Sequence, residues 1–263
     1  MNQRMTQITF LLTRPKGSLL KWIGNKYKYA EAIASYFPRD YRNYIEPFVG
    51  TGAVLATLAP EKGIASGTLT PLIDLWKLLQ QEPERLIEHY RATIERFNHA
   101  RNKTYPEVLS SYNSSPNALD LLIVSRTCYG GVVRFTREGK ISTPIGPHKP
   151  IPPEAFAERV MEWYERVKNA TFLNQSFVET MECAQEGDLI YCDPPYVDSQ
   201  SILYGSQDFS FRQLIEAIAA CKARGANVVL SIDGKKKSGK KTIELEMPKG
   251  LFEREIYFLS SSS

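Results

Sequence analysis

The clearest potential for chemistry lies in the stretch GDLIYCDPPY, residues 187–196. Its apolar part, LIYC, is too short for a helix and is closed by prolines, which is typical of a buried strand in a parallel sheet. Each proline fixes its own φ and biases the preceding residue away from the helical region. We therefore expect a rigid row of hydrogen-bond acceptors at the strand end, formed by the Asp193 carboxylate and the Pro194 carbonyl.

This row of acceptors suits a planar ligand that carries an NH2 group. The carboxylate and one carbonyl can accept its two hydrogens while Tyr196 stacks on its ring. The alternative is a plain strand end with a capping aspartate.

A second motif, EPFVGTG at residues 46–52, follows an earlier apolar run. Gly50 and Gly52 lack Cβ atoms, so a ligand can approach the backbone, and the free N–H groups of a following helix favour a carboxylate-bearing ligand. The pattern differs from G-x-G-x-x-G and has no P-loop lysine, which disfavours a dinucleotide or ATP. A simple tight turn is the alternative.

The elements that position both motifs are strands alternating with helices. Strands are expected in YRNYIEPF, GIASGTL, TFLNQSF, DLIYC, ANVVLSI and LFEREIYFL. Residues 83–169 interrupt this alternation with charged and apolar helices and a Gly/Pro-rich basic loop. We predict an α/β fold, a doubly wound sheet formed by residues 17–82 and 170–263, with residues 83–169 as a mostly helical insertion and residues 1–16 as a flexible arm. Ligands of such sheets bind beyond the carboxyl ends of the strands, where strand order reverses.

The overall composition narrows the setting. The 263 residues carry a formal net charge of +4, which is compatible with a polyanionic partner. The four cysteines show no metal-binding spacing and read as reduced thiols, as expected in the cytoplasm. The longest apolar run near the N-terminus, ITFLL, is too short for a signal peptide or a membrane span, so no membrane partner is expected.

Taken together, the motifs resemble those of DNA N6-adenine methyltransferases of the class in which the cofactor motif precedes the recognition insertion and DPPY follows it. The resemblance runs from about Leu19 to Gly234 and includes LLKWIGNKYK, IEPFVGTGAV, SRTCYGGVVRFTREGKISTPIG, IYCDPPY and ANVVLSIDG. It implies a Rossmann-like sheet that binds S-adenosylmethionine and an insertion that recognises duplex DNA. The implied reaction is methyl transfer to N6 of an adenine flipped out of the helix, without a metal.

The resemblance also implies roles for individual residues. The catalytic residues would be Asp193, Pro194, Pro195 and Tyr196. The cofactor would be held by Trp22, Lys26, Glu46, Pro47, Phe48, Gly50, Gly52 and Asp193. DNA would meet Tyr129, Arg134, Phe135, Arg137 and Lys140. We expect a monomer that acts in restriction–modification or phage DNA methylation, with a cognate restriction endonuclease as a possible partner.

Two departures from the family pattern leave other functions open. Gly67 occupies the position after the second strand where the family carries an acidic residue for the cofactor ribose, and the chain ends in SSSS where the family's sheet continues. These departures suggest a truncated or degraded member, so a catalytically silent DNA-binding relic is one alternative. A methyltransferase acting on a ribosomal RNA base is another, because related sites also use Asp-Pro-Pro-aromatic.

Overall fold

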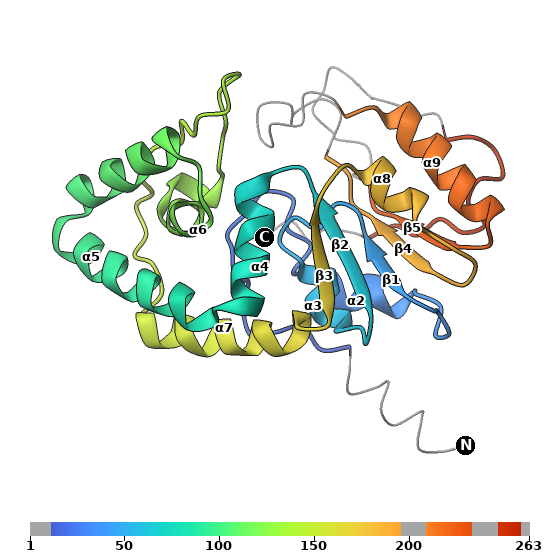
Figure 1. The fold of residues 1–263 in the computed structure, drawn as a ribbon, viewed down its shortest axis with the longest axis horizontal. Coiled ribbons are helices and arrows are strands. Elements are labelled where there is room, and N and C mark those ends of the chain that lie inside the picture. Colours follow the sequence, from blue (N-terminus) through green and yellow to red (C-terminus); the bar gives the residue numbers. More distant parts are fainter. Residues whose placement is uncertain (1–11, 196–208, 233–246, 259–263) are drawn as a thin grey trace, which may run out of the picture.

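The sheet at the centre of the molecule has five parallel strands in the order β3-β2-β1-β4-β5 (Figure 1). The computed structural model describes residues 12–195, 209–232 and 247–258. The strands are β1 (Tyr44–Glu46), β2 (Gly63–Gly67), β3 (Ala170–Asn174), β4 (Leu189–Cys192) and β5 (Asn227–Leu230).

Strand order reverses between β1 and β4, which are neighbours in space although the whole insertion separates them in sequence. Tyr44 pairs with Leu189 and Ile45 with Ile190, both in parallel register. Chain segments leaving these two strands therefore emerge side by side at the same edge of the sheet. This confirms the predicted juxtaposition of the turn after β1 and the segment that begins at Asp193.

Helices cover both faces of the sheet, because alternate side chains of each strand point to opposite sides. Leu189 and Tyr191 of β4 belong to one buried cluster, and Ile190 and Cys192 belong to another. The first cluster includes α2 (Ala30–Ser35), α3 (Ala53–Leu58) and α4 (Thr70–Gln81), and the second includes α8 (Phe177–Glu182) and α9 (Phe211–Ala223). The predicted doubly wound α/β fold is thus confirmed.

The insertion forms a helical lobe beside α4 (Figure 1). Its helices are α5 (Pro83–Ser114), α6 (Ala118–Thr127) and α7 (Pro153–Val167), with a short 3₁₀ turn, η1 (Tyr129–Gly131). Helix α5 is kinked at Ala100, where φ is −145° and ψ is 56°.

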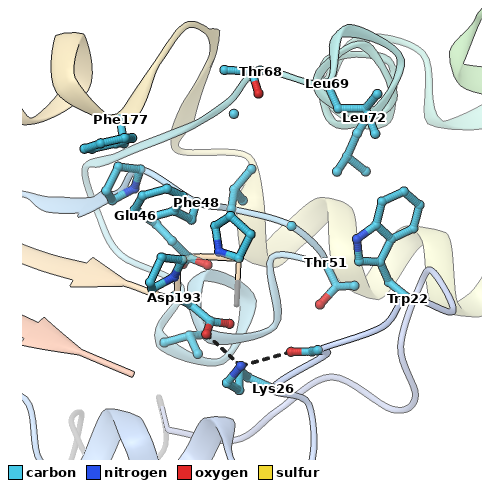
Figure 2. Close-up of a pocket in the computed structure, with 18 of the residues that line it drawn as sticks. Trp22, Lys26, Glu46, Phe48, Thr51, Thr68, Leu69, Leu72, Phe177 and Asp193 are labelled. Carbon is cyan, nitrogen blue, oxygen red and sulfur yellow. Dashed lines mark hydrogen bonds and ion pairs between the residues drawn. The ribbon is translucent and has the colours of Figure 1, made fainter. Parts of the chain in front are cut away.

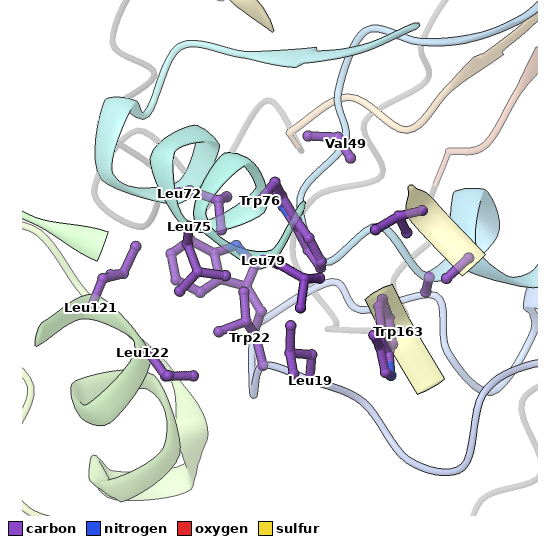
Figure 3. Close-up of a cluster of buried hydrophobic side chains, with 14 of the residues drawn as sticks. Leu19, Trp22, Val49, Leu72, Leu75, Trp76, Leu79, Leu121, Leu122 and Trp163 are labelled. Atoms are coloured by element: carbon purple, nitrogen blue, oxygen red, sulfur yellow. The ribbon is translucent and has the colours of Figure 1, made fainter. Parts of the chain in front are cut away.

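The lobe shares its hydrophobic core with the sheet. Figure 3 shows Leu121 and Leu122 of α6 facing the cluster formed by Leu75 and Leu79 of α4. The entry and exit of the insertion are joined by Gln80, whose Nε2 donates to the carbonyls of Val167 at 2.8 Å and Ala170 at 2.7 Å.

Two elements differ from the sequence-based expectation. Helix α8 was not predicted, and it begins with a capping box in which Ser176 and Glu179 satisfy each other's backbone N–H groups. The predicted strand LFEREIYFL is wrong for residues 251–258, which form no strand. Side chains anchor this segment instead, because Phe252 joins the cluster around α9 and the Phe258 ring lies 6.0 Å from that of Tyr29.

No helix among the described residues combines the length and apolar character needed to cross a membrane.

Candidate active site

A cavity of about 510 Å³ opens at the carboxyl ends of β1, β2 and β4 (Figure 2). Nine of the residues singled out from the sequence line it: Trp22, Lys26, Glu46, Pro47, Phe48, Gly50, Asp193, Pro194 and Pro195. They come from three separate stretches of the chain, which the strand order of the sheet brings together. Tyr196, the last residue of the DPPY motif, lies outside the described residues.

The glycine turn after β1 shapes one wall of the cavity. Gly50 and Gly52 adopt φ values of 44° and 59°, in the left-handed region where a side chain is strained. Gly50 lines the cavity, whereas Gly52 is the N-cap of α3 and does not. A Cβ atom at Gly52 would lie 3.3 Å from the Trp76 ring, so Gly52 allows the turn to pack on α4.

Asp193 forms an ion pair with Lys26 across the cavity, with 2.6 Å between Oδ1 and Nζ (Figure 2). The Lys26 ammonium also donates to the Gly24 carbonyl at 3.1 Å. The carboxylate at the end of β4 is therefore held against the loop at residues 22–26, which precedes α2.

Glu46 is the most deeply buried acidic residue of the cavity wall, with an exposed fraction of 3 %. The Tyr44 hydroxyl donates to its Oε2 at 2.6 Å. Burial raises the pKa of Glu46 to about 8, and the nearby negative charge of Asp193 adds to the effect. At pH 7 this carboxyl group is predominantly protonated, and a cationic ligand placed beside it would favour its ionised form.

Three phenylalanine rings line the cavity near the end of β3. Phe48 stacks on Phe177 with 5.1 Å between ring centroids and meets Phe209 edge-on at 6.0 Å. Such a group of rings suits a flat, largely apolar ligand. Phe177 and Phe209 were not predicted as site residues, because they lie far from both motifs in sequence and are brought in by α8 and by the segment before α9.

Gly67, at the end of β2, also lines the cavity and offers no carboxylate there. An added Cβ would lie 3.5 Å from Ile73 Cδ1, an ordinary van der Waals contact. The space needed for an acidic side chain at this position is therefore present.

The basic loop of the lobe folds back on itself as a short hairpin. Phe135 bridges Ile141 in antiparallel fashion, and the Ser142 amide donates to the Arg134 carbonyl at 2.9 Å. Arg134, Arg137 and Lys140 are exposed, and Tyr129 just before the hairpin is 59 % exposed. Phe135 is 3 % exposed, so its ring supports the hairpin from inside and offers no surface to DNA.

Comparison with known proteins addresses the family of the chain. Residues 22–250 match the model for the D12 class N6 adenine-specific DNA methyltransferase. The chain belongs to this D12 class family. The matched range, residues 22–250, includes the cavity, the lobe and both sheet motifs.

Individual relatives agree with this assignment. The chain is 32 % identical over 184 residues to a DNA adenine methylase of Vibrio cholerae, covering 68 % of this chain and 65 % of that protein. It is 29 % identical over 230 residues to a DNA N-6-adenine-methyltransferase of Escherichia phage P1, covering 82 % of this chain and 30 % of the phage protein. A type II methyltransferase, M1.LlaDCHI of Lactococcus lactis subsp. cremoris, is 25 % identical over 225 residues, with 80 % and 79 % covered. The chain thus spans just under two thirds of the length of the Vibrio cholerae relative.

Proposed function

We propose that this protein transfers a methyl group from S-adenosylmethionine to N6 of an adenine flipped out of duplex DNA. The observation that carries the proposal is the position of Asp193 and Pro194 on the wall of the same cavity as the Glu46–Gly50 turn. A methyl donor and an amino group could thus be held within one site, as direct transfer requires.

The residues of the cavity fit S-adenosylmethionine. The rings of Phe48, Phe177 and Phe209 suit its adenine, and the Lys26 ammonium and Glu46 carboxyl suit its carboxylate and its positive charges. Bound there, S-adenosylmethionine would supply an electrophilic methyl group on a sulfonium.

Asp193 and Pro194 would act on the acceptor. The exocyclic nitrogen of adenine is a poor nucleophile, because its lone pair is delocalised into the ring. The Asp193 carboxylate and the Pro194 carbonyl accept its two hydrogens, which localises the lone pair on nitrogen. Tyr196 is proposed to stack on the base, and the prolines keep both acceptors in place without further movement of the backbone.

The hairpin of the lobe is the proposed DNA contact. Arg134, Arg137 and Lys140 present positive charge to the phosphates and base edges, and Tyr129 is an exposed aromatic beside them. An enzyme that modifies a base must take it out of the stack, and residues 83–169 are proposed to recognise the site where this happens.

The direct test is transfer of labelled methyl from S-adenosylmethionine to mixed-sequence duplex DNA, followed by nucleoside analysis. We expect N6-methyladenine from the wild type and at least about a thousandfold less from Asp193→Ala, because the main acceptor for the amino hydrogens is lost. DNA retention in a gel-shift assay should change little, since Asp193 lies away from the hairpin in sequence and on another element. Full turnover by the variant would remove Asp193 from the mechanism, and absence of product from the folded wild type would overturn the proposed function.

The cellular setting is part of the proposal. All four cysteines are free thiols, as expected for a protein of the reducing cytoplasm. A cognate restriction endonuclease is a proposed partner, because one relative is named a type II methyltransferase. We propose that the enzyme acts as a monomer, which sedimentation with and without duplex DNA would test.

A further inference from the structure

Two arginines of the lobe meet the chain segment that leads into the cofactor pocket. Arg126 of α6 is 4 % exposed, and its Nη1 donates to the carbonyls of Leu19 at 2.9 Å and Ser18 at 3.2 Å. Arg159 of α7 donates from Nη1 to the same Ser18 carbonyl at 2.7 Å. Two helices of the lobe therefore donate hydrogen bonds to the same short stretch of backbone, Ser18 and Leu19.

Burying these two guanidinium groups lowers the stability of the fold more than a purely structural contact would require. Neither arginine forms an ion pair with a carboxylate among the residues that the structure describes, and the Nε atoms of both are buried without a hydrogen-bond partner. Burial lowers the pKa of Arg126, and the neighbouring Arg159 charge adds to this effect, whereas Tyr90 acts in the opposite direction. The ring of Phe156 lies 5.7 Å from Arg126 Cζ, within cation–π distance. A buried cation without an acidic partner lowers the stability of the fold, so the presence of Arg126 here indicates a role beyond packing.

The position of Arg126 in the chain indicates that role. Arg126 lies near the end of α6, three residues before the exposed Tyr129, and η1 alone separates this helix end from the hairpin at residues 134–142. Its acceptors, Ser18 and Leu19, lie just before Trp22 and Lys26, which line the cavity. One side chain thus connects the helix that leads into the proposed DNA-binding hairpin to the segment that leads into the proposed cofactor-binding loop.

Other contacts make this junction tight. A Cβ atom on Gly131 would lie 2.6 Å from Lys21 Cβ, so the turn after α6 rests on the segment that carries Trp22. Trp163 Nε1 donates to the Gly17 carbonyl at 3.0 Å. Figure 3 shows Leu19 and Trp22 on the same side of α4 as Leu122 of α6. A shift of the end of α6 would therefore be transmitted to residues 17–22.

We propose that Arg126 is a positioning residue that couples DNA binding at the hairpin to cofactor binding in the cavity. The inference rests on the proposed function, since it needs both ligands. Because coupling between two sites is reciprocal, DNA should change the affinity for the cofactor by the same factor as the cofactor changes the affinity for DNA.

The test measures this factor in the full chain by calorimetry. The dissociation constant of S-adenosylhomocysteine, which cannot be consumed, is determined with and without saturating mixed-sequence duplex. We expect the duplex to change it by about fivefold or more in the wild type. In Arg126→Lys, which keeps the charge but ends one bond short of the Nη1 position that reaches both carbonyls, the change should fall below about twofold.

A matched control separates coupling from stability. Arg42 pairs with the buried Asp188 at the opposite end of β1 and β4, with 2.9 Å between Nη2 and Oδ2. Arg42→Lys should lower the midpoint of thermal unfolding but keep the wild-type coupling factor. If Arg126→Lys does not fold, the coupling factor is measured in Arg159→Lys, which alters the other hydrogen bond to the Ser18 carbonyl.

The outcomes distinguish the two proposals. Independent binding of both ligands to the wild type, or full coupling in the Arg126 and Arg159 variants, would overturn the role of Arg126 and leave the methyltransferase proposal standing. Failure of the folded wild type to bind S-adenosylhomocysteine would overturn both.

Discussion

Gly67 lines the cavity without offering a carboxylate, at the position where the family resemblance implies an acidic residue for the cofactor ribose. We expect Gly67→Asp to tighten S-adenosylhomocysteine binding by about tenfold to a hundredfold, because a carboxylate can accept hydrogen bonds from both ribose hydroxyls, worth about 1–3 kcal/mol. The position has room for the side chain and a φ outside the left-handed region. Calorimetry on Gly67→Asp and on the matched, uncharged Gly67→Asn gives the comparison. Equal affinities of the wild type and Gly67→Asp would show that the ribose does not lie at this position.

Glu46 predicts a pH dependence of ligand binding. Its pKa of about 8 lies above the ordinary value of 4.5, so the empty site holds a proton at pH 7. A cationic ligand favours the carboxylate, and binding below pH 8 must therefore release that proton. We expect affinity for S-adenosylmethionine to rise by up to about tenfold per pH unit below pH 8 and then to level off.

The measurement for Glu46 is calorimetry across pH 6 to 9, with Glu46→Gln as the control. The glutamine variant has no proton to lose at this site, so the component due to Glu46 should vanish. Superimposable pH profiles for both proteins would contradict the assignment. The free energy of unfolding depends on pH in the opposite direction. The folded protein favours the protonated form of Glu46, so the contribution of this group to stability is lost as pH rises from about 4.5 to about 8.

The two motifs predicted the part of the cavity wall formed by residues 46–50 and 193–195, because they follow adjacent strands, and the family resemblance added Trp22 and Lys26. The deep burial of Glu46 and the lack of an acceptor for Arg126 Nε could not be predicted, because both depend on packing between distant segments. The burial of Phe135 was accessible in principle. Val133 and Phe135 alternate with Arg134, a period-2 pattern that indicates one buried and one exposed face.

Among the elements, the hairpin at residues 134–142 carries the proposed contact with DNA. We expect Arg134→Ala and Lys140→Ala each to reduce the salt dependence of duplex binding by about one unit in the slope of log K against log salt, if each contacts one phosphate. Binding measured at several salt concentrations gives the slope. Arg212→Ala, which removes an arginine with an 89 % exposed side chain on α9, is the control and should leave the slope unchanged. Unchanged slopes for both hairpin variants would place the DNA elsewhere.

Each difference between the expected and the observed elements has a physical reason. The pattern SFVE, residues 176–179, matches a capping box, but the expected strand TFLNQSF extends through the first two of these residues. Helix α5 continues through Pro106, because Tyr105, Val108 and Tyr112 remain buried on one side. Residues 251–258 have the composition of a strand, but their side chains anchor them to different elements, and no ladder forms.

On the scale of the whole molecule, the lobe and the sheet share one hydrophobic cluster. It extends from Ala65 and Phe172 in the strands through Leu79 of α4 to Leu122 of α6. We therefore expect a single cooperative thermal transition, and Leu122→Ala, at a site with 0 % exposure, should lower its midpoint through a loss of about 2–5 kcal/mol. Differential scanning calorimetry provides the test. A separate low-temperature transition in the variant would show that the lobe unfolds alone.

The Gln80 side chain has a consequence for how this protein can change in length. Its amide bridges positions 87 and 90 residues further along the chain, so the two ends of a long loop are already held together. In polymer terms, lengthening such a loop adds little further closure entropy, since each doubling costs only about 0.6 kcal/mol. Extra residues at the far turn, between α5 and α6, would leave both the bridge and the packed interior in place. The lobe can therefore gain or lose residues there while the sheet and its cavity keep their shape.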